Sequence, residues 1–215
     1  MDKAVIFDLD GTLIDSLPDI YHYVNVTLEK FGDKKRAYNE VRAFIGYGAK
    51  NLIKKSFGGE FDGEDLKERL DFYNEKYTAS RSPETKLFDG IREVLLELKN
   101  RGYKLAILTN KPQITTEDVY KRYLSDIGFD VVFGARDGVK IKPDPEGLNL
   151  VLEKLKVNKD NAYFVGDGET DIITGLNSGV VPIGVLWGYR DKDELVSAGA
   201  TTFAEKPSDL LNIIN

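Results

Sequence analysis

No cysteine occurs among the 215 residues, and histidine, tryptophan and methionine each occur once. Without cysteine the chain can form neither a disulfide nor a thiolate zinc site, and it has no thiol nucleophile. The single histidine, His22, falls within a predicted helix, where packing or solvent exposure is a more common role than chemistry. Thiol and histidine chemistries are therefore not expected.

Basic residues are in the minority, since 30 lysines and arginines stand against 36 aspartates and glutamates and give a formal charge of −6. A nucleic-acid-binding surface needs a basic face, so no nucleic-acid partner is expected, whereas a local site can still bind a small charged metabolite. Long hydrophobic runs are also missing: the first apolar run, residues 4–7, is interrupted at Asp8, too soon for a signal peptide or a membrane span. We expect a cytoplasmic protein with no membrane partner, either a monomer or a homodimer.

With 41% hydrophobic and 31% charged residues, the composition is that of an ordinary globular protein. Short apolar runs rich in β-branched residues predict buried parallel strands over residues 4–7, 105–108, 131–133, 162–165 and 181–186. Segments with helical spacing lie between them, with apolar faces formed by Ile91, Val94, Leu95 and Leu98 and by Leu148, Val151, Leu152 and Leu155. This alternation predicts an α/β fold with a Rossmann-like parallel sheet.

One long stretch interrupts the alternation. From about residue 15 to about residue 80 there is no strand run, only helical patterns, and Gly58-Gly59 and Gly63 divide them into shorter pieces. Pro83 ends the stretch, because proline disfavours helix at the residue before it. We predict an α/β core domain formed by residues 1–14 and 82–215, and an inserted α-helical cap domain formed by residues 15–81.

The first predicted strand ends in Asp8-Leu9-Asp10-Gly11-Thr12-Leu13. Open α/β sheets bind their ligands at the carboxyl ends of the strands. Two carboxylates this close repel each other unless a cation lies between them or one keeps its proton, and these outcomes suit a metal site and a general acid. A lone Asp-x-Asp, however, is more often a turn or a helix cap.

Three later strand ends favour the chemical interpretation. Thr109-Asn110 follows residues 105–108, Lys142 comes near residues 131–133, and Asp167 and Asp171 follow residues 162–165. Taken singly, Thr109 or Asn110 is typical of a helix N-cap and Lys142 of a solvated loop. Together they supply a nucleophile, a hydroxyl and an ammonium for phosphate oxygens, and carboxylates for Mg²⁺, which phosphoryl transfer requires.

Two other phosphate and metal motifs are absent. No Gly-x-x-x-x-Gly-Lys-Ser/Thr segment is present, so the chain is not a P-loop enzyme. The segment from Asp8 is not a calcium loop either, since Gly11 comes too early and a strand precedes it. Mg²⁺ suits a water-rich site with few carboxylates better.

In their order and spacing these segments resemble the motifs of the haloacid dehalogenase superfamily, which read Asp-x-Asp-Gly-Thr, Thr/Ser, Lys and Gly-Asp-x-x-x-Asp. The resemblance covers essentially the whole chain, and the helical insertion is similar to that superfamily's type-one cap. Three segments resemble the phosphoglycolate phosphatase branch: residues 8–20, residues 44–49 and Leu186-Trp187-Gly188-Tyr189.

The resemblance implies a Mg²⁺-dependent hydrolase that passes the phosphoryl group of a small phosphomonoester through an aspartyl-phosphate. Asp8 would be the nucleophile and a metal ligand. Asp10 would protonate the leaving oxygen, then activate water, and would offer the metal its backbone carbonyl. Because Asp8 and the phosphate are both anionic, the metal is expected to be obligatory.

The same resemblance assigns the remaining core residues. Thr109 would hydrogen-bond the phosphoryl group, Lys142 would neutralise its charge and orient Asp8, and Asp167 and Asp171 would complete the metal ligands. One departure is Gly168, where many relatives carry Ser or Thr, and we expect it to change the support of the metal without abolishing binding.

Further residues are candidates for substrate binding. In the predicted cap, glycines could bring backbone N–H groups close to a small anion, and basic side chains could meet a distal carboxylate or second phosphate. A helix turn with solvated charges explains the same cap residues equally well. The candidates are Gly11, Thr12 and Asn110 in the core, and Arg42, Gly46, Gly48 and Lys50 in the cap.

Other functions share part of this pattern. A β-phosphoglucomutase-like phosphotransferase would use the same core residues, but such mutases look to carry an acidic residue in place of Gly166. A dehalogenase is less expected, because Asp10 is an acid that a halide leaving group does not need. A phospho-signalling receiver domain also combines aspartates, Thr and Lys around Mg²⁺, yet the helical insertion argues against it. A non-catalytic binding module is the least expected.

Overall fold

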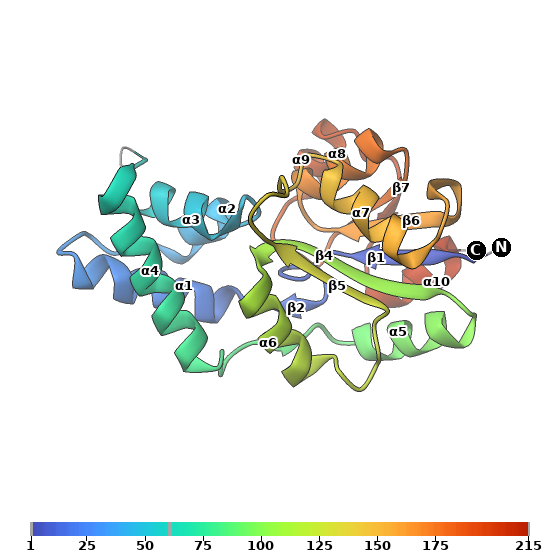
Figure 1. Cartoon of the computed structure of the whole chain (residues 1–215), viewed down its shortest axis with the longest axis horizontal. Coiled ribbons are helices and arrows are strands. Elements are labelled where there is room, and N and C mark those ends of the chain that lie inside the picture. The colour runs from blue at the N-terminus through green and yellow to red at the C-terminus, as the bar shows by residue number, and fades with distance from the viewer. Residues whose placement is uncertain (1, 60–61, 215) are drawn as a thin grey trace. The chain divides into compact units, whose positions relative to one another are not determined.

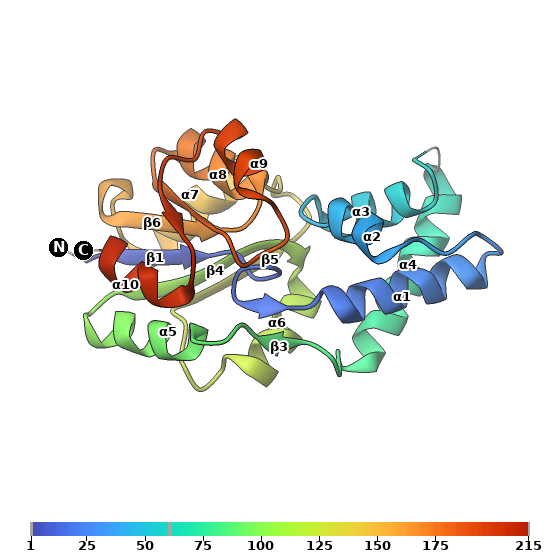
Figure 2. The ribbon, with the colours of Figure 1, turned by 180° about the vertical axis from the view of Figure 1, so that it is seen from behind.

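The computed structural model describes residues 2–59 and 62–214 and divides into two compact units (Figures 1 and 2). The chain up to Asp15 and from Leu87 onward forms an α/β unit, and Ser16–Lys86 form a helical unit. The second boundary therefore comes five residues later than the predicted 81/82. Residues 84 and 85 belong to the helical unit because the Asp19 carboxylate accepts hydrogen bonds from the Thr85 hydroxyl (2.7 Å) and the Glu84 N–H (3.1 Å).

Among the described residues, six parallel strands form the sheet of the α/β unit in the order β5-β4-β1-β6-β7-β8. The first strand, β1, lies inside the sheet, and its Phe7 pairs with Ile107 on one side and Val165 on the other. The predicted α/β fold with a Rossmann-like parallel sheet is confirmed. The strands are β1 (Ala4–Phe7), β4 (Lys104–Pro112), β5 (Val131–Ala135), β6 (Ala162–Gly166), β7 (Val181–Val185) and β8 (Phe203–Ala204).

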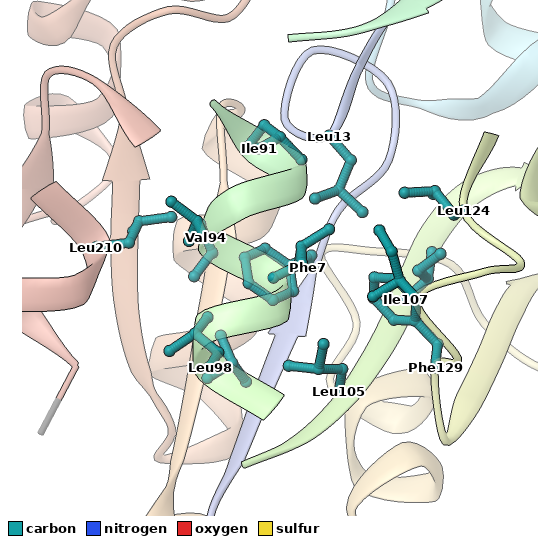
Figure 3. Close-up of a cluster of buried hydrophobic side chains, with 14 of the residues drawn as sticks. Phe7, Leu13, Ile91, Val94, Leu98, Leu105, Ile107, Leu124, Phe129 and Leu210 are labelled. Atoms are coloured by element: carbon teal, nitrogen blue, oxygen red, sulfur yellow. The ribbon is translucent and has the colours of Figure 1, made fainter. Parts of the chain in front are cut away.

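Helices cover both faces of this sheet (Figure 1). One face carries α5 (Ile91–Asn100), α6 (Gln113–Tyr123) and α10 (Leu210–Ile213), and the other carries α7 (Glu146–Leu155) and α8 (Glu169–Ser178), with α9 (Lys192–Ser197) packed against α8. Because side chains alternate along a strand, successive residues of β1 enter different cores. Figure 3 shows Phe7 beside Val94 and Leu98 of α5 and Ile107 of β4, with the apolar face of α5 turned inward as predicted.

The strand β4 differs from the prediction. It extends to Pro112, so Thr109 and Asn110 lie within it instead of following it, and its register with β5 shifts between Leu108 and Pro112. Such a shift re-aims side chains at the end of a strand. The short strands β2 (Ile14–Asp15) and β3 (Lys86–Leu87) pair with each other, and 3₁₀ turns occur at Lys159–Asn161 and Pro207–Asp209.

The helical unit is built from α1 (Leu17–Lys30), α2 (Tyr38–Phe44), α3 (Gly48–Ser56) and α4 (Gly63–Ser80). The apolar face of α1 is buried at Ile20, Val24 and Leu28. The apolar face of α4 is buried at Leu66, Tyr73 and Tyr77, whereas Leu70 on the same predicted face is only half-buried. His22 lies on α1 and contacts the edge of the Tyr23 ring. None of the helices in the described part of the chain is long and apolar enough to cross a bilayer.

Candidate active site

Polar side chains gather at the carboxyl ends of three neighbouring strands. Asp8 follows β1, Thr109 lies near the end of β4, and Asp167 follows β6. Neighbouring strands are roughly 4.8 Å apart, so groups on three adjacent strands fall within about 10 Å of one another. The side chains of Asp8, Thr109, Lys142, Asp167 and Asp171 are all buried.

Three of these carboxylates form a compact cluster. Oxygens of Asp8, Asp167 and Asp171 all lie within 4.8 Å of one another. Burial, opposed by Lys142 and reinforced by the two neighbouring carboxylates, raises the pKa of Asp8 to about 8. Burial and the charge of Asp171 likewise raise the pKa of Asp167 to about 7. Three buried carboxylates that cannot all ionise without a counter-charge fit a hard divalent cation, which would bind them in their ionised form.

Lys142 joins two members of this cluster. Its Nζ lies 2.8 Å from Asp8 Oδ1 and 2.6 Å from Asp171 Oδ1. Burial disfavours the ammonium, but Asp171 and Asp8 outweigh it and raise the pKa of Lys142 above its ordinary value. Lys142 is therefore positively charged and directed at Asp8.

Asn110 fixes the main chain at Lys142. The Asn110 amide donates to the Lys142 carbonyl, and the Lys142 N–H donates to Asn110 Oδ1, both at 2.9 Å. This reciprocal pair anchors the loop after β5 to the end of β4. Asn110 thus supports the site through Lys142, and its predicted contact with substrate stays a prediction.

Asp167 is held by residues from distant parts of the chain. Thr12 Oγ1 donates to Asp167 Oδ1 (3.1 Å), and the Tyr189 N–H donates to Asp167 Oδ2 (2.7 Å). Gly11 has a φ of 86°, and a Cβ added to Gly11 or to Gly188 would lie closer than 3.0 Å to the Asp167 side chain. Only glycine fits these two positions without moving Asp167.

Sequence reasoning missed several of these supports. The indole N–H of Trp187 donates to the Thr12 carbonyl (3.0 Å), and the Arg190 side chain pairs with Glu169 (3.1 Å). Lys111 is a further residue of this kind, since its Nζ lies 3.0 Å from Asp10 Oδ1. The sequence carries no signal for Lys111, because the polar residues Thr109 and Asn110 end the apolar run and a lysine after them is typical of a solvated loop.

Known proteins resemble this chain in both sequence and fold. Residues 5–185 match the model of the haloacid dehalogenase-like hydrolase family. The chain belongs to the haloacid dehalogenase-like hydrolases. Its α/β fold and its buried acidic cluster agree with the resemblance found in the sequence.

Several relatives of this hydrolase cover nearly its whole length. A phosphoglycolate phosphatase of Mannheimia succiniciproducens is 32% identical, over 99% of this chain and 98% of its own. One from Colwellia psychrerythraea is 30% identical, over 92% and 90%. Among solved structures, a predicted phosphatase from Clostridium acetobutylicum has a TM-score of 0.87 at 30% identity, covering 100% of this chain and 99% of its own. The chain is a phosphatase of the haloacid dehalogenase type.

The candidate residues of the predicted core lie in the α/β unit, and the four candidates of the predicted cap lie in the helical unit. Arg42 lies on α2, Gly46 lies between α2 and α3 with a φ of 113°, and Gly48 and Lys50 lie on α3. Their contact with substrate stays a prediction. In the α/β unit, the Gly168 N–H donates to Asp171 Oδ2 (2.9 Å), so the backbone supports the cluster at the position that lacks a hydroxyl.

Proposed function

We propose that this hydrolase is a Mg²⁺-dependent phosphomonoesterase that forms an aspartyl-phosphate on Asp8. The observation that carries the proposal is the pairing of a buried carboxylate cluster with Lys142, whose Nζ is 2.8 Å from Asp8 Oδ1. Mg²⁺ would be held by Asp8, Asp167, Asp171 and the backbone carbonyl of Asp10. When bound, the ion would neutralise the charge of the carboxylates and of the phosphoryl oxygens.

In the first half of the reaction, an Asp8 oxygen attacks phosphorus, and the bond from phosphorus to the ester oxygen breaks. Lys142 stabilises the attacking carboxylate and the phosphoryl oxygens, and the Thr109 hydroxyl hydrogen-bonds the phosphoryl group. Asp10 gives its proton to the departing ester oxygen. The alcohol leaves, and the phosphoryl group remains on Asp8.

In the second half, water attacks the phosphorus of the aspartyl-phosphate. Asp10, now a carboxylate, accepts the proton of this water. The bond between Asp8 and phosphorus breaks, inorganic phosphate is released, and both aspartates return to their starting states. The same residue therefore acts as acid and then as base.

Hydrolysis is favoured over a mutase reaction by the packing at Gly166. A Cβ added there would lie closer than 3.0 Å to the Asp171 side chain, so no acidic residue fits without moving Asp171. The acidic residue that the mutases look to carry at this position has no room here. The first candidate substrate is 2-phosphoglycolate, because the relatives from Mannheimia succiniciproducens and Colwellia psychrerythraea are named for it.

The helical unit is proposed to act as a cap that excludes bulk water and selects the substrate. Arg42, Lys50 and the glycines at 46 and 48 would contact the part of the substrate distant from phosphorus. The chain segments near residues 12–17 and 80–87, which join the two units, would serve as hinges. In this proposal the α/β unit is the core domain and the helical unit is the cap domain.

The proposal is tested by measuring phosphate release from a panel of small phosphomonoesters with and without Mg²⁺. Asp8→Asn is expected to lower kcat by at least about 1,000-fold, because it removes the nucleophile. Asp10→Asn is expected to lower it by about 100- to 10,000-fold, because it removes the acid and base. Asp137→Asn, the same exchange at an exposed position of the α/β unit, is the matched control.

The intermediate is tested by mixing excess enzyme with a ³²P-labelled ester and quenching in acid. Label is expected on the wild-type protein and on Asp10→Asn, and it should be absent from Asp8→Asn. Phosphate release that survives Asp8→Asn, or label on another residue, would contradict the aspartyl-phosphate on Asp8.

A further inference from the structure

The Asp-x-Asp segment contains two separate ion pairs. Asp8 pairs with Lys142, whereas Asp10 pairs with Lys111, whose Nζ lies 3.0 Å from Asp10 Oδ1 and 3.2 Å from Oδ2. Lys111 lies on β4, and its N–H donates to the Thr109 hydroxyl (3.2 Å). The Lys111 side chain is only 6% exposed and the Asp10 side chain 12%. The proposed reaction uses Lys142 but gives Lys111 no task.

The position of Lys111 relates it to the leaving group. In the proposed function, Asp10 gives a proton to the ester oxygen, which requires about 2.6–3.2 Å between the two oxygens. Lys111 Nζ lies 3.0 to 3.2 Å from the Asp10 oxygens. The ammonium is therefore no more than about 6.4 Å from the ester oxygen of a reacting substrate. A group attached one or two carbons beyond that oxygen is within reach of Lys111.

The chemistry of Lys111 determines which group it can recognise. A buried ammonium interacts favourably with an anion and unfavourably with a cation or an apolar group. An ammonium also has three rotatable N–H donors, so it can bond a substrate anion while it keeps a bond to an Asp10 oxygen. Selection by Lys111 therefore acts on the charge of the leaving group.

We infer that Lys111 is the specificity-determining residue that binds a second anionic group of the substrate, a carboxylate or phosphate within two carbons of the ester oxygen. The inference rests on the proposed function and adds a substrate class to it. Esters with a neutral or cationic leaving group of the same size would lack this contact and would be poorer substrates.

The test uses esters of similar size that differ in charge: 2-phosphoglycolate, ethyl phosphate and O-phosphoethanolamine, with ethane-1,2-diol bisphosphate to compare a second phosphate with a carboxylate. Lys111→Met is expected to lower kcat/KM for 2-phosphoglycolate by at least about tenfold more than for ethyl phosphate, since a charge-assisted hydrogen bond is lost. It should also reduce the discrimination against O-phosphoethanolamine. Lys111→Arg, which keeps the charge, should retain the preference for anions.

Two controls separate recognition from support of Asp10. Lys154→Met makes the same exchange at an exposed position of α7 and should leave all the ratios unchanged. If Lys111 acted only by holding Asp10, Lys111→Met would lower kcat/KM for every ester by the same factor, and that result would overturn the inference. Lys111→Gln, which keeps a polar side chain, replaces Lys111→Met if the latter does not fold.

The outcomes also distinguish this inference from the proposed function. If the wild-type protein releases phosphate from some ester with Mg²⁺ but Lys111→Met leaves the ratio between esters unchanged, only the assignment of Lys111 is wrong. If the wild-type protein releases phosphate from other phosphomonoesters of the wider panel but from none of these four, only the substrate class is overturned. If it releases phosphate from no ester of the wider panel, the proposed function is overturned together with the substrate class. A preference for the bisphosphate over 2-phosphoglycolate would identify phosphate as the second anion.

Discussion

Removing the metal should make this protein less stable as the pH rises, which is the reverse of ordinary acid unfolding. In the unfolded chain Asp8 and Asp167 have the ordinary aspartate pKa of about 3.8, and burial raises these pKa values to about 8 and about 7 in the folded state. Between these values the folded protein holds protons that the unfolded chain has released. The free energy of unfolding therefore falls as pH rises from about 4 to about 8.

The size of the effect follows from the two shifts. From pH 5.5 to 8.5, Asp8 keeps its proton over about 2.5 pH units and Asp167 over about 1.5. At about 1.36 kcal/mol per unit these intervals correspond to about 3 and about 2 kcal/mol, so the loss is up to about 5 kcal/mol. Such a loss is comparable with the whole stability of many domains. Mg²⁺ binds the ionised carboxylates, so adding it should restore stability mainly at high pH.

The assay is urea unfolding in EDTA across this pH range, followed by the fluorescence of Trp187, which is the only tryptophan and lies in the α/β unit. Few other side chains change charge between pH 5.5 and 8.5, because the chain has one histidine and no cysteine. Asp167→Asn cannot ionise and keeps an acceptor oxygen for the Tyr189 N–H, while its NH2 group takes the place of the oxygen that faces the Thr12 hydroxyl. It should remove about 2 kcal/mol of the pH dependence. A metal-free midpoint that stays constant or rises between pH 5.5 and 8.5 would refute the reasoning.

Three further substitutions test the supports of the site and of the helical unit. Gly188→Ala should destabilise the α/β unit by about 1–3 kcal/mol in urea and weaken Mg²⁺ binding in calorimetry, because its methyl group would overlap Asp167. Trp187→Phe should lower the free energy of unfolding by about 0.5–1.5 kcal/mol, measured by circular dichroism, because the Thr12 carbonyl loses its hydrogen-bond donor. Asp19→Ala should cost about 1–3 kcal/mol and melt the helical unit first, because the Glu84 N–H loses its acceptor. Unchanged midpoints of the unfolding transitions would show that these contacts do not stabilise the protein.

The sheet and the helix faces could be predicted from the sequence because each depends on a short local pattern. The run Ala4–Phe7 is fully buried on both faces, and a continuous apolar run of that length is typical of such a strand. The polar residues just after the runs at 4–7 and 162–165 then had to meet at one edge of the sheet. Local periodicity and parallel topology together therefore predict the place of Asp8 and Asp167.

The supports of the site could not be predicted because they depend on contacts between distant segments. Trp187 bonds the carbonyl of Thr12, and the Tyr189 N–H bonds Asp167, pairings that no periodicity encodes. The end of β4 was missed for a related reason, since the polar residues Thr109 and Asn110 stop the apolar run although the backbone remains extended to Pro112. At these positions tertiary contacts, and not the local sequence pattern, determine the structure.

The internal place of β1 has a consequence for how the chain is made. Both neighbours of β1 come much later in the sequence, with partners from Lys104 on one side and from Ala162 on the other. At typical synthesis rates β1 waits roughly ten to thirty seconds for the second of them, while the helical unit can already fold. During that time Ala-Val-Ile-Phe is an unpaired apolar strand, the kind of segment that aggregates unless charges flank it. Asp8 and Asp10 place two charges directly after this strand, so we expect the aspartates to oppose aggregation of the nascent chain before the active site has formed.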